Sequence, residues 1–229
     1  MRPWLLMLCR VAQITVGLAV LGTGIGLLLQ AGLGLSPWEV FAQGIAGRIG
    51  LSFGTTVVII SVVVLLLWIP MRERPGLGTI ANGLLVGPFA ELSTWVLPQV
   101  SEWWERGLAC AIGVLLTGIG TACYIAAGFG SGPRDGLMTG LHRITGKPVW
   151  ALRTAIEVTV LGAGWLLGGT VGIGTVFCAF TVGPVIGFFL PRFVLPGAPV
   201  RVRPARQTDA AAAAATRTGS APPSSDASA

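Results

Sequence analysis

Two carboxylates placed 96 residues apart are the groups in this sequence best suited to chemistry. Glu39 lies in GLGLSPWEVF, and Asp135 lies at the matching place in GFGSGPRDGL. A carboxylate within a membrane can exchange a proton or hold a cation, because an ionised group there requires a partner. Helix initiation is the second interpretation, with Ser36 as N-cap, Pro37 at the first helical position and Glu39 bonding back to a free backbone N–H. The second copy offers, in the same three places, Gly132, Pro133 and Asp135.

Three further charges lie inside apolar stretches and belong to the same hypothetical substrate or ion pathway. Glu157 follows Arg153 by four residues, so an ion pair within one helix is expected. The alternative is that Glu157 carries a proton or binds substrate, with Arg153 as its counter-charge. Glu91 has no charged neighbour within a turn and is either hydrated at the outer surface or part of an outward vestibule.

His142, the single histidine, is expected in a solvated loop rather than as a pH sensor.

No catalytic or cofactor-binding pattern is present, which predicts that the protein is not an enzyme and uses no cofactor. There is no phosphate-binding glycine loop, metalloprotease pair or serine triad. The cysteines lie in apolar surroundings without metal or redox spacing, so they are expected to serve packing and to bind no metal. They are Cys9, Cys110, Cys123 and Cys178.

The composition indicates an all-α, polytopic membrane protein. Apolar residues make up 53% of the 229 residues and charged residues 10%, against roughly a quarter charged in a soluble domain. Apolar runs long enough to cross a bilayer predict six spans. Their approximate ranges are 11–30, 52–70, 77–97, 107–127, 149–168 and 173–191. The first is expected to be an uncleaved anchor rather than a signal peptide, because no cleavage pattern follows it.

The chain repeats itself with an offset of 96 residues. Residues 15–92 align with 111–188 without a gap and share 19 identities, ten of them glycine on glycine. Three spans in each unit would send the second copy into the bilayer from the opposite side, which predicts inverted repeats. This depends on residues 36–50 and 132–146 being short amphipathic or re-entrant helices, since a fourth span in each unit would make the copies parallel.

A broken helix is expected at each copy of the motif, with glycines permitting a sharp change of direction before the next helix. The helix-break residues are Gly32, Gly34, Ser36, Pro37, Gly128, Gly130, Gly132 and Pro133. A second repeated element, at 76–88 and 172–184, begins the third span of each unit. Its small residues favour close helix packing over pore lining.

The placement of arginine and lysine predicts that both termini are cytoplasmic in a bacterial cell membrane. The net charge of +6 then reflects membrane orientation and not nucleic-acid binding. The predicted divisions are a cytoplasmic N-terminus at 1–10, the first repeat at 11–97, an outer loop at 98–106, the second repeat at 107–191 and a disordered cytoplasmic tail at 192–229.

The paired Gly-x-Gly-x-x-Pro-x-acid motifs at 32–39 and 128–135, with Gly-x-Gly-Thr at 76–79 and 172–175, resemble the YitT/YczE group of bacterial integral membrane proteins. The similarity covers roughly residues 10–190. It implies a compact polytopic protein of the cell membrane and carries no substrate or reaction with it. Longer YitT-type members add a soluble C-terminal domain, and this chain is expected to be nearer the shorter YczE branch.

The sequence therefore predicts a small secondary transporter or permease with its pathway between two inverted repeats. The expected partners are the lipid bilayer, an unidentified small solute and a second copy in a homodimer. Two alternatives stay open, namely a membrane accessory protein that moves no solute and the solute-binding membrane subunit of a larger importer.

Overall fold

The computed structural model describes residues 3–195, and within that range every regular element is a helix. The first unit contains α1 (Pro3–Ala31), α2 (Pro37–Ile49), α3 (Phe53–Met71) and α4 (Leu77–Val96). The second contains α5 (Trp103–Ala126), α6 (Pro133–Thr145), α7 (Val149–Leu166) and α8 (Ile173–Phe193). The starts of α6, α7 and α8 each follow the starts of α2, α3 and α4 by 96 residues, as 133 follows 37, 149 follows 53 and 173 follows 77.

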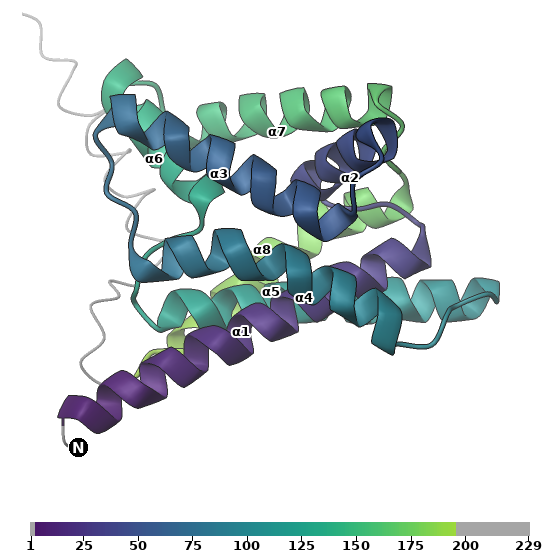
Figure 1. The fold of residues 1–229 in the computed structure, drawn as a ribbon, viewed down its shortest axis with the longest axis horizontal. Coiled ribbons are helices and arrows are strands. Elements are labelled where there is room, and N and C mark those ends of the chain that lie inside the picture. Colours follow the sequence, from purple (N-terminus) through teal and green to yellow (C-terminus); the bar gives the residue numbers. More distant parts are fainter. Residues whose placement is uncertain (1–2, 196–229) are drawn as a thin grey trace, which may run out of the picture.

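The helices form two layers (Figure 1). In one layer α1 packs against α5, α4 against α1, and α8 against α5. In the other layer α2 packs against α7 and α3, while α6 packs against α3 and α7. The layers meet where α4 packs on α3 and α6. The long helices run along the length of the molecule, and α2 and α6 are the two short ones (Figure 1).

The α1–α5 contact at the centre depends on glycine. A Cβ on Gly24 would lie 2.7 Å from the carbonyl oxygen of Gly113, and a Cβ on Gly120 would lie 2.7 Å from that of Gly17. Backbones at this distance leave no room for a side chain, which is the close packing typical of small residues in membrane helices. These four glycines form two of the pairs that the 96-residue offset aligns.

The predicted helical membrane fold is confirmed at the level of class. Five described helices are long and apolar enough to cross a membrane, namely α1, α3, α5, α7 and α8. The remaining expected span, α4, is a helix of 20 residues that is not among the five. It carries Thr79, Asn82, Glu91 and Ser93 in its sequence.

Two predicted boundaries move by a few residues. The helix α5 begins at Trp103, inside the expected outer loop, so the connection from α4 is shorter than 98–106. The helix α8 continues to Phe193, just beyond the expected start of the tail. Residues 196–229 of the predicted tail, and residues 1–2, lie outside the described residues.

Candidate functional site

Each copy of the repeated motif ends one helix and begins the next. Gly34 and Gly130 have φ angles of 120° and 121°, a backbone conformation that residues with a side chain rarely adopt. The chain then becomes extended at Ser36 and Gly132, and the helices α2 and α6 start at the following prolines. The capping box expected from Ser36 and Glu39 is not formed, since Ser36 makes no side-chain cap hydrogen bond and Glu39 bonds elsewhere.

The second repeated element docks on the first element of the other unit. The Gly78 N–H donates to the Phe129 carbonyl oxygen at 3.0 Å, and the Gly174 N–H donates to the Leu33 carbonyl oxygen at 2.8 Å. A Cβ on Gly76 would lie 2.1 Å from that Phe129 oxygen, so only glycine fits this contact. The Gly-x-Gly-Thr motifs are therefore packing contacts that hold the loops of the broken helices in place.

Two arginines hold the same loops from the other side. Arg10 donates from Nε to the Ala127 carbonyl at 2.7 Å and from an Nη to the Gly128 carbonyl at 3.2 Å. Arg106 donates in the same way, at 2.7 and 3.2 Å, to the carbonyls of Ala31 and Gly32. They satisfy carbonyls at the C-terminal ends of α5 and α1, where backbone acceptors lack helical partners. Arg10 and Arg106 are themselves 96 residues apart, so the two units hold their loops with equivalent arginines.

An ion pair joins the starts of α2 and α6. Glu39 on α2 is 5% exposed, and its Oε1 accepts a hydrogen bond from Arg134 on α6 at 2.6 Å. The Arg134 guanidinium also lies 5.2 Å from the ring centre of Trp38. The Trp38 indole N–H is buried and has no hydrogen-bond partner within residues 3–195. Arg134 was not among the predicted site residues, because its own counterpart at the 96-residue offset is Trp38.

Asp135 lies one residue further along α6 and takes part in no ion pair in the described part of the chain. It shares the space around Gly132 with two uncharged polar groups. A Cβ built on Gly132 would lie 2.9 Å from Tyr124 Oη, 3.4 Å from Asp135 Oδ2 and 3.8 Å from Asn82 Oδ1. Tyr124 comes from α5 and Asn82 from α4, so three helices contribute oxygen atoms to this spot.

Arg153 and Glu157 on α7 form the intrahelical pair expected from their spacing, with 2.9 Å between Nε and Oε1. Arg153, Arg134 and Glu157 lie close enough to Asp135 to act on it electrostatically. Four of the five predicted pathway residues, together with Arg134, thus belong to one neighbourhood. We call this set the central charge cluster: Glu39, Arg134, Asp135, Arg153 and Glu157.

Glu91 does not belong to the central charge cluster. Its Oε2 accepts hydrogen bonds from Ser52 Oγ at 2.7 Å and from the Gly54 N–H at 3.0 Å, so it caps the start of α3. It also lines a cavity of about 400 Å³, together with Thr55, Val58, Pro88, Leu92 and Trp95. Glu91 is therefore a helix-capping carboxylate beside an open cavity.

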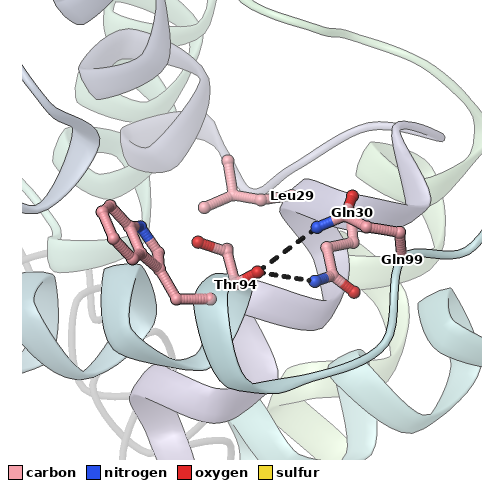
Figure 2. A pocket seen from close by; sticks show the side chains of 5 residues that line it. Leu29, Gln30, Thr94 and Gln99 are labelled. Carbon is pink, nitrogen blue, oxygen red and sulfur yellow. Dashed lines mark hydrogen bonds between the residues drawn. The ribbon is translucent and has the colours of Figure 1, made fainter.

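A second cavity of about 520 Å³ adjoins the C-terminal end of α4 and is lined by Leu29, Gln30, Thr94, Trp95 and Gln99. Figure 2 shows the amides of Gln30 and Gln99 converging on the backbone oxygen of Thr94, at 3.1 and 3.4 Å. No residue of the central charge cluster lines either cavity. The cluster joins the buried Glu39 to side chains that are partly or largely exposed, and both cavities lie away from it.

The remaining candidates have local partners. His142, in the last turn of α6, is exposed, and its Nδ1 lies 2.6 Å from the Lys147 carbonyl oxygen. All four cysteines are free thiols, two of them buried and two partly buried. Within residues 3–195 no group of three or more His, Cys, Asp or Glu side chains is arranged to hold a metal ion.

These observations define a multi-pass helical membrane protein whose charged residues meet where two broken helices face each other. The chain belongs to DUF6198, a family of unknown function, which matches residues 8–191. The predicted resemblance to the YitT/YczE group is confirmed by the relatives described next.

Three bacterial proteins are similar to this chain over most of its length. An uncharacterized protein of Haemophilus influenzae is 38% identical, covering 82% of this chain and 86% of the relative. The uncharacterized membrane protein YczE of Bacillus subtilis is 33% identical over 78% of this chain and 84% of YczE. The uncharacterized protein YyaS of the same organism is 29% identical over 77% of this chain and 90% of YyaS. No solved structure matches the chain.

Proposed function

We propose that this protein is a small secondary transporter or permease of the bacterial cell membrane, with its pathway between two inverted repeats. In such transporters, broken helices meet near the middle of the bilayer and their N-termini point at the substrate or ion. The observation that carries the proposal is the 2.6 Å ion pair between Glu39 and Arg134, which joins the starts of the two short helices.

Burial of charge supports this placement. A buried ion pair contributes little net stability, because removing two charges from water offsets their attraction. Glu157 occupies the middle of α7, so an α7 that crosses the bilayer would carry this charge at the depth where charge is most costly. Charges held there at such cost are expected to serve a passage for a polar solute or ion.

The membrane orientation in this proposal has both termini in the cytoplasm. Cationic residues near the N-terminus, in the α3–α4 connection and around the end of α6 then share the cytoplasmic side. The start of α2 would be approached from outside the cell and the start of α6 from the cytoplasm. A homodimer would add protein around a pathway that a single chain surrounds with few helices.

Solute flux in proteoliposomes tests the proposal. The full chain is reconstituted, and uptake is measured for a panel of amino acids, organic anions and sugars under a sodium or proton gradient. The expected result is saturable uptake of at least one solute class, lost in Arg134→Gln, which leaves Glu39 buried without its partner. Gly162→Ala is the control, because a Cβ at Gly162 meets nothing within 4 Å.

Two outcomes would replace the proposal. Absence of flux, together with stable copurification of one fixed partner protein, would indicate a membrane accessory protein. Solute binding without flux, restored by an added ATPase, would indicate the membrane subunit of a larger importer.

A further inference from the structure

We propose that Asp135, Tyr124 and Asn82 form a binding site for one sodium-sized monovalent cation. The inference rests on the proposed function only in treating this cation as a coupling ion, since binding itself can be measured without transport. It assigns the site to the second unit alone, at the start of α6.

Charge balance is the first argument. Glu39 is paired with Arg134 at 2.6 Å, and Glu157 is paired with Arg153 at 2.9 Å. An ionised Asp135 gives the central charge cluster three carboxylates against two guanidiniums, which leaves one negative charge without a partner. An uncompensated carboxylate away from water is costly and requires a counter-ion. One excess negative charge matches a monovalent cation better than a divalent one.

The arrangement of oxygen atoms is the second argument. Tyr124 Oη, Asp135 Oδ2 and Asn82 Oδ1 lie 2.9, 3.4 and 3.8 Å from the point where a Cβ on Gly132 would stand. Tyr124 is only 3% exposed, and within residues 3–195 no side chain forms a hydrogen bond with its hydroxyl. A carboxylate, a hydroxyl and an amide oxygen are hard donors of the kind that bind alkali and alkaline-earth cations. A side chain at residue 132 would stand against all three oxygens.

The backbone of Gly132 lies beside the side chains of Tyr124 and Asp135. A hydrogen bond from its N–H would not exhaust either oxygen, because a carboxylate has about four lone-pair sites and a hydroxyl two. Asp135 therefore keeps acceptor sites with which to ligate a cation.

The first unit provides an internal comparison. The positions 96 residues from Tyr124 and Asn82 are Leu28 and Cys178, which are 1% and 3% exposed. Neither offers an oxygen ligand, and the carboxylate there, Glu39, already has a guanidinium partner. The equivalent place in the first unit is therefore apolar and balanced in charge. We expect a single cation per chain.

Equilibrium binding of radioactive sodium to the purified full chain tests the site, at fixed pH and with choline maintaining ionic strength. Saturable binding of one ion per chain is expected, and Asp135→Asn should weaken it at least about tenfold by removing the charged ligand. Tyr124→Phe should also weaken it by removing one ligand oxygen. Gly132→Ala should weaken it by placing a methyl group against the three oxygens. Cys178→Ala and Gly162→Ala should bind as the unchanged chain does, and size-exclusion profiles should show every variant folded.

Binding that is absent, or equal in Asp135→Asn and the unchanged chain, would overturn the inference. So would uptake of a proton alone, seen as a pH-dependent shift in melting temperature that sodium does not alter. Sodium binding without solute flux in proteoliposomes would retain the site and reject the transporter. Flux that proceeds equally well in choline would reject the site and retain the transporter.

Discussion

The helix pairs α3–α4 and α7–α8 occupy equivalent places in the two units, but the helices of the first pair pack together much more closely than those of the second. In the first pair the backbones touch, since a Cβ on Gly87 would lie 2.4 Å from the Gly54 carbonyl oxygen. In the second pair, Trp150 stands where Gly54 would be and is 72% exposed, while a Cβ on Gly183 would meet nothing within 4 Å. The helix α8 has no comparable contact with α7 in the described part of the chain.

The difference follows from three substitutions between the copies, Ser52 to Pro148, Gly54 to Trp150 and Glu91 to Gly187. Ser52 and Glu91 bind each other across the first pair, and their counterparts in the second are Pro148 and Gly187, which cannot form that bond. In the first pair Gly54 faces Gly87, which lets the two backbones approach closely. In the second pair Trp150 takes the place of Gly54, and the backbones do not approach. Transporters of inverted repeats work by moving one unit against the other. In the proposed function, α3–α4 is the closed side of the pathway and α7–α8 is the open side.

The largest effect is expected from crowding the closed pair. Gly87→Leu forces a side chain into the Gly54 backbone and should lower the free energy of unfolding by about 1–3 kcal/mol, the usual cost of overpacking. The matched change Gly183→Leu has open space and should raise it by up to about 1 kcal/mol, the usual gain in helix propensity over glycine. Both variants gain the same helix propensity, so the difference isolates the contact. Thermal unfolding in detergent measures it, and equal shifts would contradict the described difference between the pairs.

Removal of the arginine contacts should have an intermediate effect and be similar in the two units. Arg10→Gln and Arg106→Gln each lose two charge-assisted hydrogen bonds to helix-terminal carbonyls and should each cost about 1–2 kcal/mol of unfolding free energy. Their hydrogen bonds match, but Arg10 also lies 4.3 Å from the ring centre of Phe129, so its cost should exceed that of Arg106 by up to about 1 kcal/mol. A large cost in one variant and none in the other would show that the units do not hold their loops in the same way.

The smallest effect concerns the cap on α3. Glu91→Gln should lower the free energy of unfolding by about 1 kcal/mol, the usual value of a helix cap. Ser52→Ala tests the partner, and the double variant should cost less than the sum of the two single changes, because they share one interaction. Strict additivity would mean that the Ser52–Glu91 hydrogen bond contributes nothing to closing this pair.

The helix breaks could be predicted from the sequence, because glycine and proline act through local backbone geometry and their positions are given by the sequence itself. Sequence reasoning also placed Arg153 and Glu157 together, since their spacing alone puts them on one helical face. It did not find Arg134 as the partner of Glu39 or Tyr124 and Asn82 as neighbours of Asp135. These contacts join residues from different helices, and at each position the other copy has a residue of different chemistry.

The 96-residue offset also relates residues that precede the aligned range 15–92. It pairs Arg10 with Arg106, and this equivalence indicates that both arginines have a structural role in addition to their effect on membrane orientation. The failure of the expected capping box has a different cause. Glu39 can satisfy a backbone N–H or a guanidinium, and only the packing of α6 against its neighbours brings Arg134 within reach.

Cysteine labelling of two equivalent loops tests the inverted arrangement most directly. Leu51 follows α2 and Lys147 follows α6, both are exposed, and they are 96 residues apart. Each is changed to cysteine in a chain whose four native cysteines are replaced by alanine, and intact cells are treated with a membrane-impermeant maleimide. Inverted repeats predict that Leu51→Cys is labelled in intact cells and Lys147→Cys only after permeabilisation. Labelling of both positions from the same side would contradict the inverted repeat and the pathway proposed between its halves.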